Sequence, residues 1–103
     1  MSLVEISSIA KKYTFNLLQD TFTNIQIRFS LIIYNYNAPS NKLLLTSFIE
    51  NIQNLYLISD YIYQNNLYGV ELSYQVKIIR DGCQSMKDYI KTFFKIVPTT
   101  YNL

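Results

Sequence analysis

Residues 23–35 read TNIQIRFSLIIYN, and this stretch decides the fold that the sequence predicts. Apolar residues occupy every second position of its central part, and they are Ile25, Ile27, Phe29, Leu31 and Ile33. That alternation is typical of a β-strand with one buried face. The sequence therefore predicts a strand over about residues 23–35, and a turn cluster around Pro39 ends it.

A second alternation lies 45 residues further along the chain. Its apolar positions are Val70, Leu72, Tyr74, Val76 and Ile78, and polar residues stand between most of them. The pattern predicts a second strand, which ends at the turn signal Asp81-Gly82.

Helical patterns surround both predicted strands. Ser2 and Glu5 have the spacing of a capping box, and the apolar spacing behind them predicts a helix over residues 3–19. A second helix is expected from about residue 41, or from 47, to 66, because Asn65-Asn66 is a suitable C-terminal stop. A third helix is expected over 86–97, where Ser85 would be the N-cap and Pro98 the stop.

Sliding the chain along itself by 45 residues aligns these elements without a gap. We interpret this as an internal duplication, with one repeat unit at 2–37, the next at 47–82 and a closing helix at 86–97. Accidental agreement of patterns is the alternative. The expected fold is a small single α+β domain over residues 1–103, in the order α-β-α-β-α. A sheet of two strands is marginally stable and leaves its strand edges unpaired. These edges and the groove between the repeats are therefore candidate binding surfaces.

Composition limits the chemistry of the chain. It has 103 residues with a net charge of +2, and 50% are hydrophobic while 16% are charged. There is no His, and Cys83 is the only cysteine, so zinc sites, disulfides and His-dependent triads lose their usual residues. Two glycines are too few for a glycine-rich phosphate loop. We therefore expect no catalysis, no metal and no cofactor, and a buried, inert Cys83.

Aromatic residues favour a binding role. The chain contains ten Tyr and six Phe, a large share for one small core, and Tyr is enriched at protein interfaces. The candidate protein-binding residues are Tyr34, Tyr36, Tyr61, Tyr63 and Tyr68. They favour a protein–protein interaction module that binds a partner protein or peptide through the inter-repeat groove, a strand edge or a homodimer face.

The alternative function is nucleic-acid binding. The candidate residues are Lys77, Arg80, Lys87, Lys91 and Lys95, and the last three share one face of the expected C-terminal helix because their spacing is four. Such a face can contact phosphates weakly and in a salt-sensitive way. A solvated stripe on an amphipathic helix would show the same pattern.

The sequence also indicates a location and a resemblance. No secretory signal and no apolar run of about 20 residues is seen, so we expect a soluble intracellular protein that neither is secreted nor spans a membrane. The abundance of Ile, Tyr, Asn and Leu without His resembles small proteins of the filamentous viruses that infect the hyperthermophilic archaea Acidianus and Sulfolobus. A phage, poxvirus or AT-rich bacterial source is also open. The resemblance implies a single-domain factor in the host cytoplasm that binds partner proteins or nucleic acid.

Overall fold

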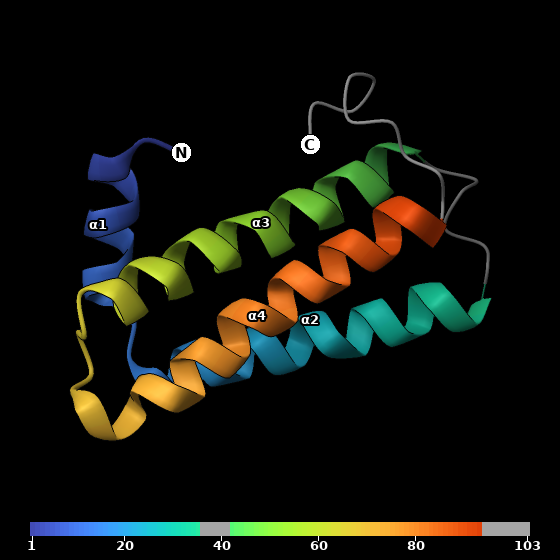
Figure 1. Cartoon of the computed structure of the whole chain (residues 1–103). Helices are drawn as coiled ribbons and strands as arrows, with labels where there is room; N and C mark the ends of the chain where they lie inside the picture. The colour runs from blue at the N-terminus through green and yellow to red at the C-terminus, as the bar shows by residue number, and fades with distance from the viewer. Residues whose placement is uncertain (36–41, 94–103) are drawn as a thin grey trace.

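The computed structural model describes residues 1–35 and 42–93, and within these ranges all regular structure is helical. The helices are α1 (Leu3–Lys12), α2 (Phe15–Asn35), α3 (Lys42–Gln64) and α4 (Val70–Phe93). In Figure 1 the three long helices run lengthwise, with α3 antiparallel to α2 and α4, and α1 stands across one end of α3. The expected α+β fold is therefore wrong, because both predicted strands are helical.

The first predicted strand is part of α2, and its alternation has a simple physical origin. The helix buries Leu18, Phe22 and Ile25 and half-buries Phe29 and Ile32, a 4-3-4-3 spacing that keeps one face inward. Apolar residues also lie on the opposite face. Ile27 and Leu31 fall between the inward positions and remain exposed, so two opposed helical faces together imitate a period of two.

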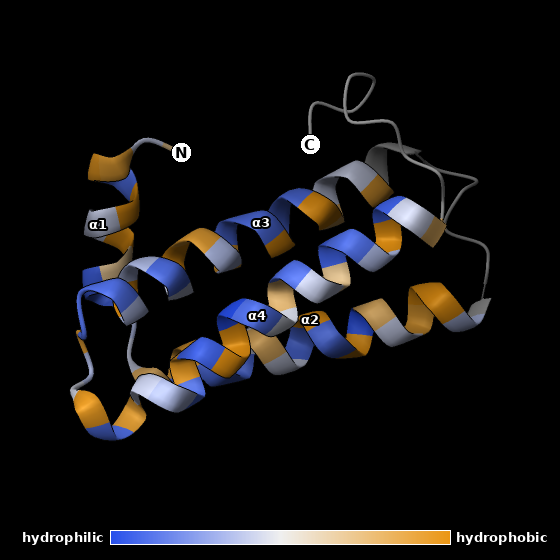
Figure 2. Cartoon of the chain, viewed as in Figure 1, coloured by the Kyte–Doolittle hydropathy of each residue, from blue (hydrophilic) through white to orange (hydrophobic). Residues whose placement is uncertain are grey.

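The second predicted strand is the first part of α4 and arises in the same way. Val76 is buried at 1% exposure, whereas Val70, Tyr74 and Ile78 lie on the outer side of the helix. The inward face of α4 has strict 3-4 spacing, and its buried residues are Val76, Ile79, Cys83, Met86 and Ile90. Figure 2 shows hydrophobic and hydrophilic residues interspersed along the long helices.

Helix α3 is the centre of the fold. Its buried positions repeat at 3-4 spacing, the pattern of knobs-into-holes packing, and they are Leu45, Phe48, Ile52, Leu55, Ser59 and Ile62. Ile49 and Ile58 widen this buried face, which allows α3 to contact α1, α2 and α4 together. The molecule measures 42 × 26 × 18 Å along its principal axes.

The predicted helix over residues 3–19 is in fact two helices. Its start is confirmed, because Ser2 and Glu5 form both hydrogen bonds of the capping box. It breaks at Tyr13, whose backbone is extended, and Thr14 caps the next helix by accepting a hydrogen bond from the Leu17 amide at 3.0 Å. No Gly or Pro marks this break in the sequence.

The turn between α3 and α4 confirms the predicted stop at Asn65-Asn66. Asn66 adopts a left-handed backbone with φ of 53°, and its amide donates to the Tyr63 carbonyl. Gly69, with φ of 83°, then lets the backbone turn into the start of α4. The alternative helix start at residue 47 and the N-cap expected at Ser85 both lie inside helices instead, and α3 begins at Lys42, close to the first of the two expected starts.

The interpretation as a structural duplication is also wrong. At an offset of 45, the break after α1 at residues 13–14 falls on residues 58–59, which lie inside α3. The turn at residues 65–69 falls on residues 20–24, which lie inside α2. The closing helix expected over 86–97 begins at Val70, and residues 94–97 lie outside the described ranges.

Candidate functional site

The outer face of α2 has a regular series of exposed positions, most of them apolar. Six exposed positions follow 3-4-3-4-3 spacing along this face, and they are Leu17, Asp20, Asn24, Ile27, Leu31 and Tyr34. We call these six residues the outer seam. Its second half is apolar and open to solvent, with exposed fractions of 55% for Ile27, 56% for Leu31 and 84% for Tyr34. Regular 3-4 spacing is the pattern that a helix presents to another helix.

The outer seam lies opposite the face by which α2 joins the core. Residues of the core-facing side, Leu18, Phe22 and Ile25, are at most 9% exposed. The sequence pattern assigned Ile27 and Leu31 to the buried face of a strand and so missed their exposure. The signal that could have found them is the second 3-4 series, which begins at Leu17 and runs beside the first.

A second set of exposed apolar residues lies on the first turns of α4. Val70, Tyr74 and Ile78 recur at a spacing of four, with exposed fractions of 80%, 69% and 50%. The series does not continue, because the next positions of similar orientation, Asp81 and Ser85, are polar. This patch is therefore shorter than the outer seam of α2.

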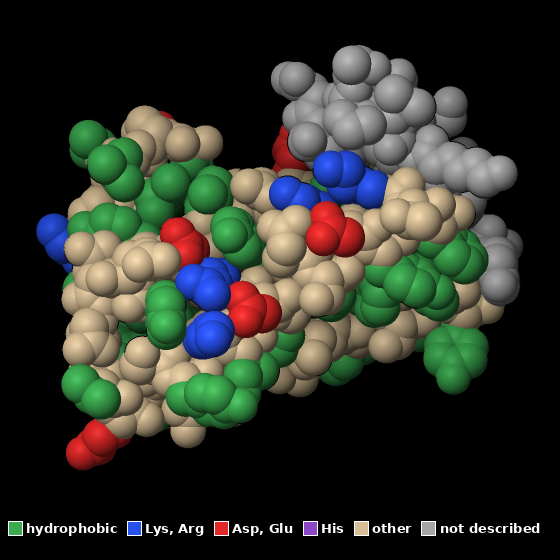
Figure 3. Space-filling model, viewed as in Figure 1, with side chains coloured by type: hydrophobic (Ala, Val, Ile, Leu, Met, Phe, Trp, Pro, Cys, Tyr) green, Lys and Arg blue, Asp and Glu red, His purple; other side chains and the backbone are tan. Residues whose placement is uncertain are grey.

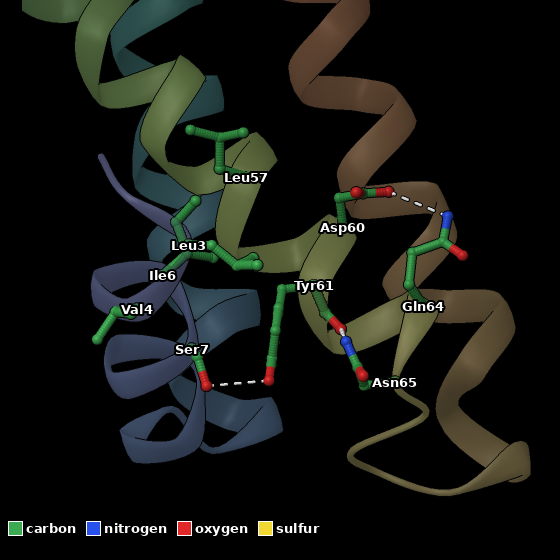
Figure 4. A pocket seen from close by; sticks show the side chains of 9 residues that line it. All are labelled: Leu3, Val4, Ile6, Ser7, Leu57, Asp60, Tyr61, Gln64 and Asn65. Carbon is green, nitrogen blue, oxygen red and sulfur yellow. Dashed lines mark hydrogen bonds between the residues drawn. The ribbon is translucent and has the colours of Figure 1, made fainter.

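A groove of about 720 Å³ separates α1 from the C-terminal half of α3 (Figure 4). Its α1 wall consists of Leu3, Val4, Ile6 and Ser7, and its α3 wall includes Leu57 and Tyr61. In the close-up, Tyr61 reaches across the groove to Ser7. The volume is that of a ligand pocket, although the groove is open along its length.

The polar groups of this groove already have partners. Tyr61 and Ser7 share a hydrogen bond of 2.9 Å between their hydroxyls, and the Asn65 amide donates to the Tyr61 carbonyl. The Gln64 amide donates to Asp60, whose carboxylate also pairs with Arg80 at 3.2 Å. The groove therefore offers apolar contact and few free polar groups to orient a ligand.

A smaller hollow of about 410 Å³ lies between α1, α2 and α3. Its floor contains buried Ile25, Leu55 and Ile58, whereas Asn24 and Arg28 belong to its exposed wall. The Arg28 guanidinium lies 4.7 Å from the centre of the Phe48 ring, a cation–π contact that ties this wall to α3.

Three of the five candidate tyrosines serve contacts within the chain. Tyr61 bonds to Ser7, and the Tyr68 hydroxyl donates to the Tyr13 carbonyl at 3.0 Å. The Arg80 guanidinium lies over the Tyr63 ring, with its central carbon 4.7 Å from the ring centre. All three are partly buried against the core. Tyr34 is exposed and belongs to the outer seam, and Tyr36 lies outside the described residues.

The four candidate basic residues within the described ranges share one side of α4, and two of them, Arg80 and Lys87, bond to other side chains. Arg80 pairs with Asp60 at 3.2 Å and with Asp81 at 3.0 Å, and Lys87 donates to the Gln53 side chain at 2.6 Å. Lys77 is exposed, Lys91 is half-buried, and Lys95 lies outside the described residues. Figure 3 shows blue side chains lying next to red ones on this face, so positive charge is interrupted by carboxylates.

Cys83 and Lys87, two titratable side chains of α4, have shifted pKa values. Burial raises the pKa of the Cys83 thiol to about 12, which keeps it protonated and inert, as the sequence predicts. Burial, followed by the neighbouring charge of Lys91, lowers the pKa of Lys87. Among residues 1–35 and 42–93, no three Cys, Asp or Glu side chains gather where they could hold a metal ion.

The fold and these surfaces define a small helical bundle with an uncovered apolar seam. No described helix combines the length and the apolar character needed to cross a membrane. No family model, no curated protein and no solved structure matches this chain.

Proposed function

We propose that this protein is a non-catalytic protein–protein interaction module whose outer seam on α2 binds a helix of another polypeptide chain. The observation that carries the proposal is the 3-4 series of exposed positions on a helix whose opposite side already fills the core. A soluble surface helix normally has one apolar face, so a second apolar face favours a second partner. Leu17, Ile27, Leu31 and Tyr34 are large enough to act as anchors in the groove of a facing helix.

Other routes to the same function have less support. Strand edges and an inter-repeat groove require strands and repeats, and the described residues contain neither. The groove between α1 and α3 is open and has few free polar groups, whereas the seam has a register that a partner helix can follow. Nucleic-acid binding by α4 has less support too, because Arg80 is committed to two carboxylates.

We extend the proposal to the location of the protein in the cell and to its origin. An intracellular location is favoured by the single, buried, reduced Cys83. The resemblance to small proteins of archaeal filamentous viruses adds a viral source to the proposal, but binding through the outer seam does not depend on it.

A peptide selection tests the proposed function. A library of amphipathic helical peptides is selected against the wild-type protein, and the affinity of enriched peptides is measured by titration calorimetry. We expect Ile27→Lys to weaken binding by at least about tenfold, because a charge then replaces a seam anchor. Ile78→Lys is the matched control, since Ile78 is 50% exposed on α4 and Ile27 is 55% exposed on α2. Equal loss in both variants, or no enriched peptide, contradicts the proposal.

A further inference from the structure

The outer seam contains polar residues whose placement indicates which helix covers it. Asp20 and Asn24 occupy the first half of the seam, and Leu31 and Tyr34 occupy the second half. Arg28 follows Ile27 directly and flanks the seam on the side of α3, exposed to solvent while its guanidinium lies over the Phe48 ring. The two halves therefore differ in polarity, and the charges available for pairing are Asp20 in the first half and Arg28 beside the second.

We propose that the partner helix is α2 of a second copy of this chain, packed antiparallel against the outer seam of the first. This inference rests on the proposed function, because it names the occupant of the same surface. In an antiparallel pair the seam positions meet in layers whose residue numbers add to 51. Leu17 then faces Tyr34 of the second copy, Asn24 faces Ile27, and Asp20 lies level with Leu31.

Charge decides between the two possible orientations. A parallel pair would place Asp20 of one copy directly opposite Asp20 of the other, and like charges in one seam destabilise it. The antiparallel pair instead places Asp20 within reach of Arg28 of the second copy, because Arg28 lies three residues, or about 4.5 Å along the axis, from the layer of Asp20. The twofold axis makes this pairing occur twice and closes the assembly as a dimer.

The apolar area of the seam sets the strength of the pair. Four large side chains at the observed exposures leave on the order of 500 Å² open on each copy, so two seams bury on the order of 1,000 Å². That area lies near the lower limit for a specific interface. We therefore expect a reversible dimer that dissociates on dilution rather than an obligate one.

A charge-exchange experiment tests the inference. The wild-type chain, Asp20→Arg and Arg28→Asp are each examined by sedimentation equilibrium from about 1 to about 300 μM, a span suited to a weak interface. The wild type is expected to dimerise. Each variant is expected to dimerise at least about tenfold more weakly, because it places like charges at both contacts. An equimolar mixture of the two variants restores both pairs and is expected to recover the dimer.

Each result bears on the inference. A wild type that stays monomeric over the whole range overturns it, as does a mixture that fails to dimerise when both variants are folded by circular dichroism. Charge variants that dimerise like the wild type overturn it as well. Asp20→Arg leaves the contact between Arg28 and Phe48 intact, so its effect is separable from any effect on the fold. If the chain is monomeric but the peptide selection succeeds, the second-copy inference fails while the proposed function stands.

Discussion

Gly82 shows how a single residue sets the distance between two helices. It lies in the interior of α4, where glycine costs about 1 kcal/mol relative to alanine. A Cβ added there would lie 2.6 Å from the Phe22 Cζ atom, closer than side-chain atoms approach one another. Phe22 is itself buried, so its ring has little room to move away. Glycine at position 82 thus allows α2 to pack closely on α4. The sequence predicts a turn at Asp81-Gly82, but both residues lie inside the helix.

A double-mutant cycle tests this explanation. Gly82→Ala should lower the free energy of unfolding by about 1 kcal/mol, because overpacking costs more than the gain in helix propensity. In a Phe22→Leu background the same change should raise it by about 0.5–1 kcal/mol, since the ring is gone and only the propensity gain is left. Urea unfolding followed by circular dichroism gives both values. The same sign in both backgrounds would refute the steric explanation.

Cys83 links stability to alkaline pH. The folded protein keeps the thiol protonated up to its pKa of about 12, whereas the unfolded chain loses that proton from about pH 9 upward. The unfolded state therefore binds fewer protons between these values, and the free energy of unfolding should fall by about 1.4 kcal/mol per pH unit there. Below pH 9 the contribution is fully present.

Comparison with Cys83→Ala isolates this effect from the titration of other groups. The variant loses core contacts at every pH, but it has no thiol to ionise. The stability difference between wild type and variant should shrink by about 2 kcal/mol between about pH 8 and about pH 10.5. Chemical unfolding at the two pH values measures it. A difference that stays constant would show that the thiol is accessible to ionisation in the folded state.

At the scale of elements, the apolar positions of α2 and α4 were assigned the two-residue period of a strand, although they follow the 3-4 spacing of a helix. The start of α1 and the stop at Asn66 could be predicted, because each depends on local residues. The burial of Cys83 could be predicted because a lone free cysteine is usually buried. The strand predictions failed because Ile25 and Phe29 face inward while Ile27 and Leu31 face outward. In a chain whose helices have two apolar faces, alternation alone does not separate strand from helix. The same two faces that misled the prediction supply the candidate site.

The break between α1 and α2 depends on a residue far away in sequence. The Tyr68 hydroxyl, from the turn before α4, donates to the Tyr13 carbonyl, and the Tyr68 ring packs edge-on against Phe15 at 6.1 Å. Burial, followed by the proximity of Tyr13, raises the Tyr68 pKa. No local pattern predicts a contact between residues 55 positions apart. This contact fixes where α1 ends relative to the bundle.

Tyr68→Phe should therefore loosen α1 without loosening α3 and α4. Removing the hydroxyl leaves the Tyr13 carbonyl without this donor, a loss of about 1 kcal/mol. Amide hydrogen exchange in α1 should become about fivefold faster, while the core amides of α3 keep their protection. Tyr63→Phe is the matched control, because the contact of Tyr63 with Arg80 uses its ring. Equal acceleration in both variants would contradict a specific role for the Tyr68 hydroxyl.

At the scale of the whole molecule, the arrangement of charge distinguishes the two functions considered for the chain. The net charge is only +2. On the side of α4 where Lys77, Arg80, Lys87 and Lys91 lie, Asp60, Asp81 and Asp88 lie among them, which leaves a local charge of +1. Nucleic-acid affinity grows with the number of phosphates that a protein neutralises. Cations that already face carboxylates contribute little to that number.

We therefore expect no duplex binding of physiological strength. At about 150 mM salt, the dissociation constant for a short DNA duplex should be weaker than about 100 μM, the weak limit of ordinary non-specific binding. Fluorescence anisotropy of a labelled duplex measures it. Asp60→Asn combined with Asp81→Asn releases Arg80 from both partners and should tighten binding several-fold at low salt, because it adds a free phosphate contact. Micromolar binding by the wild type at 150 mM salt, lost in Lys87→Gln and Lys91→Gln, would instead favour nucleic-acid binding over the outer seam as the function of the chain.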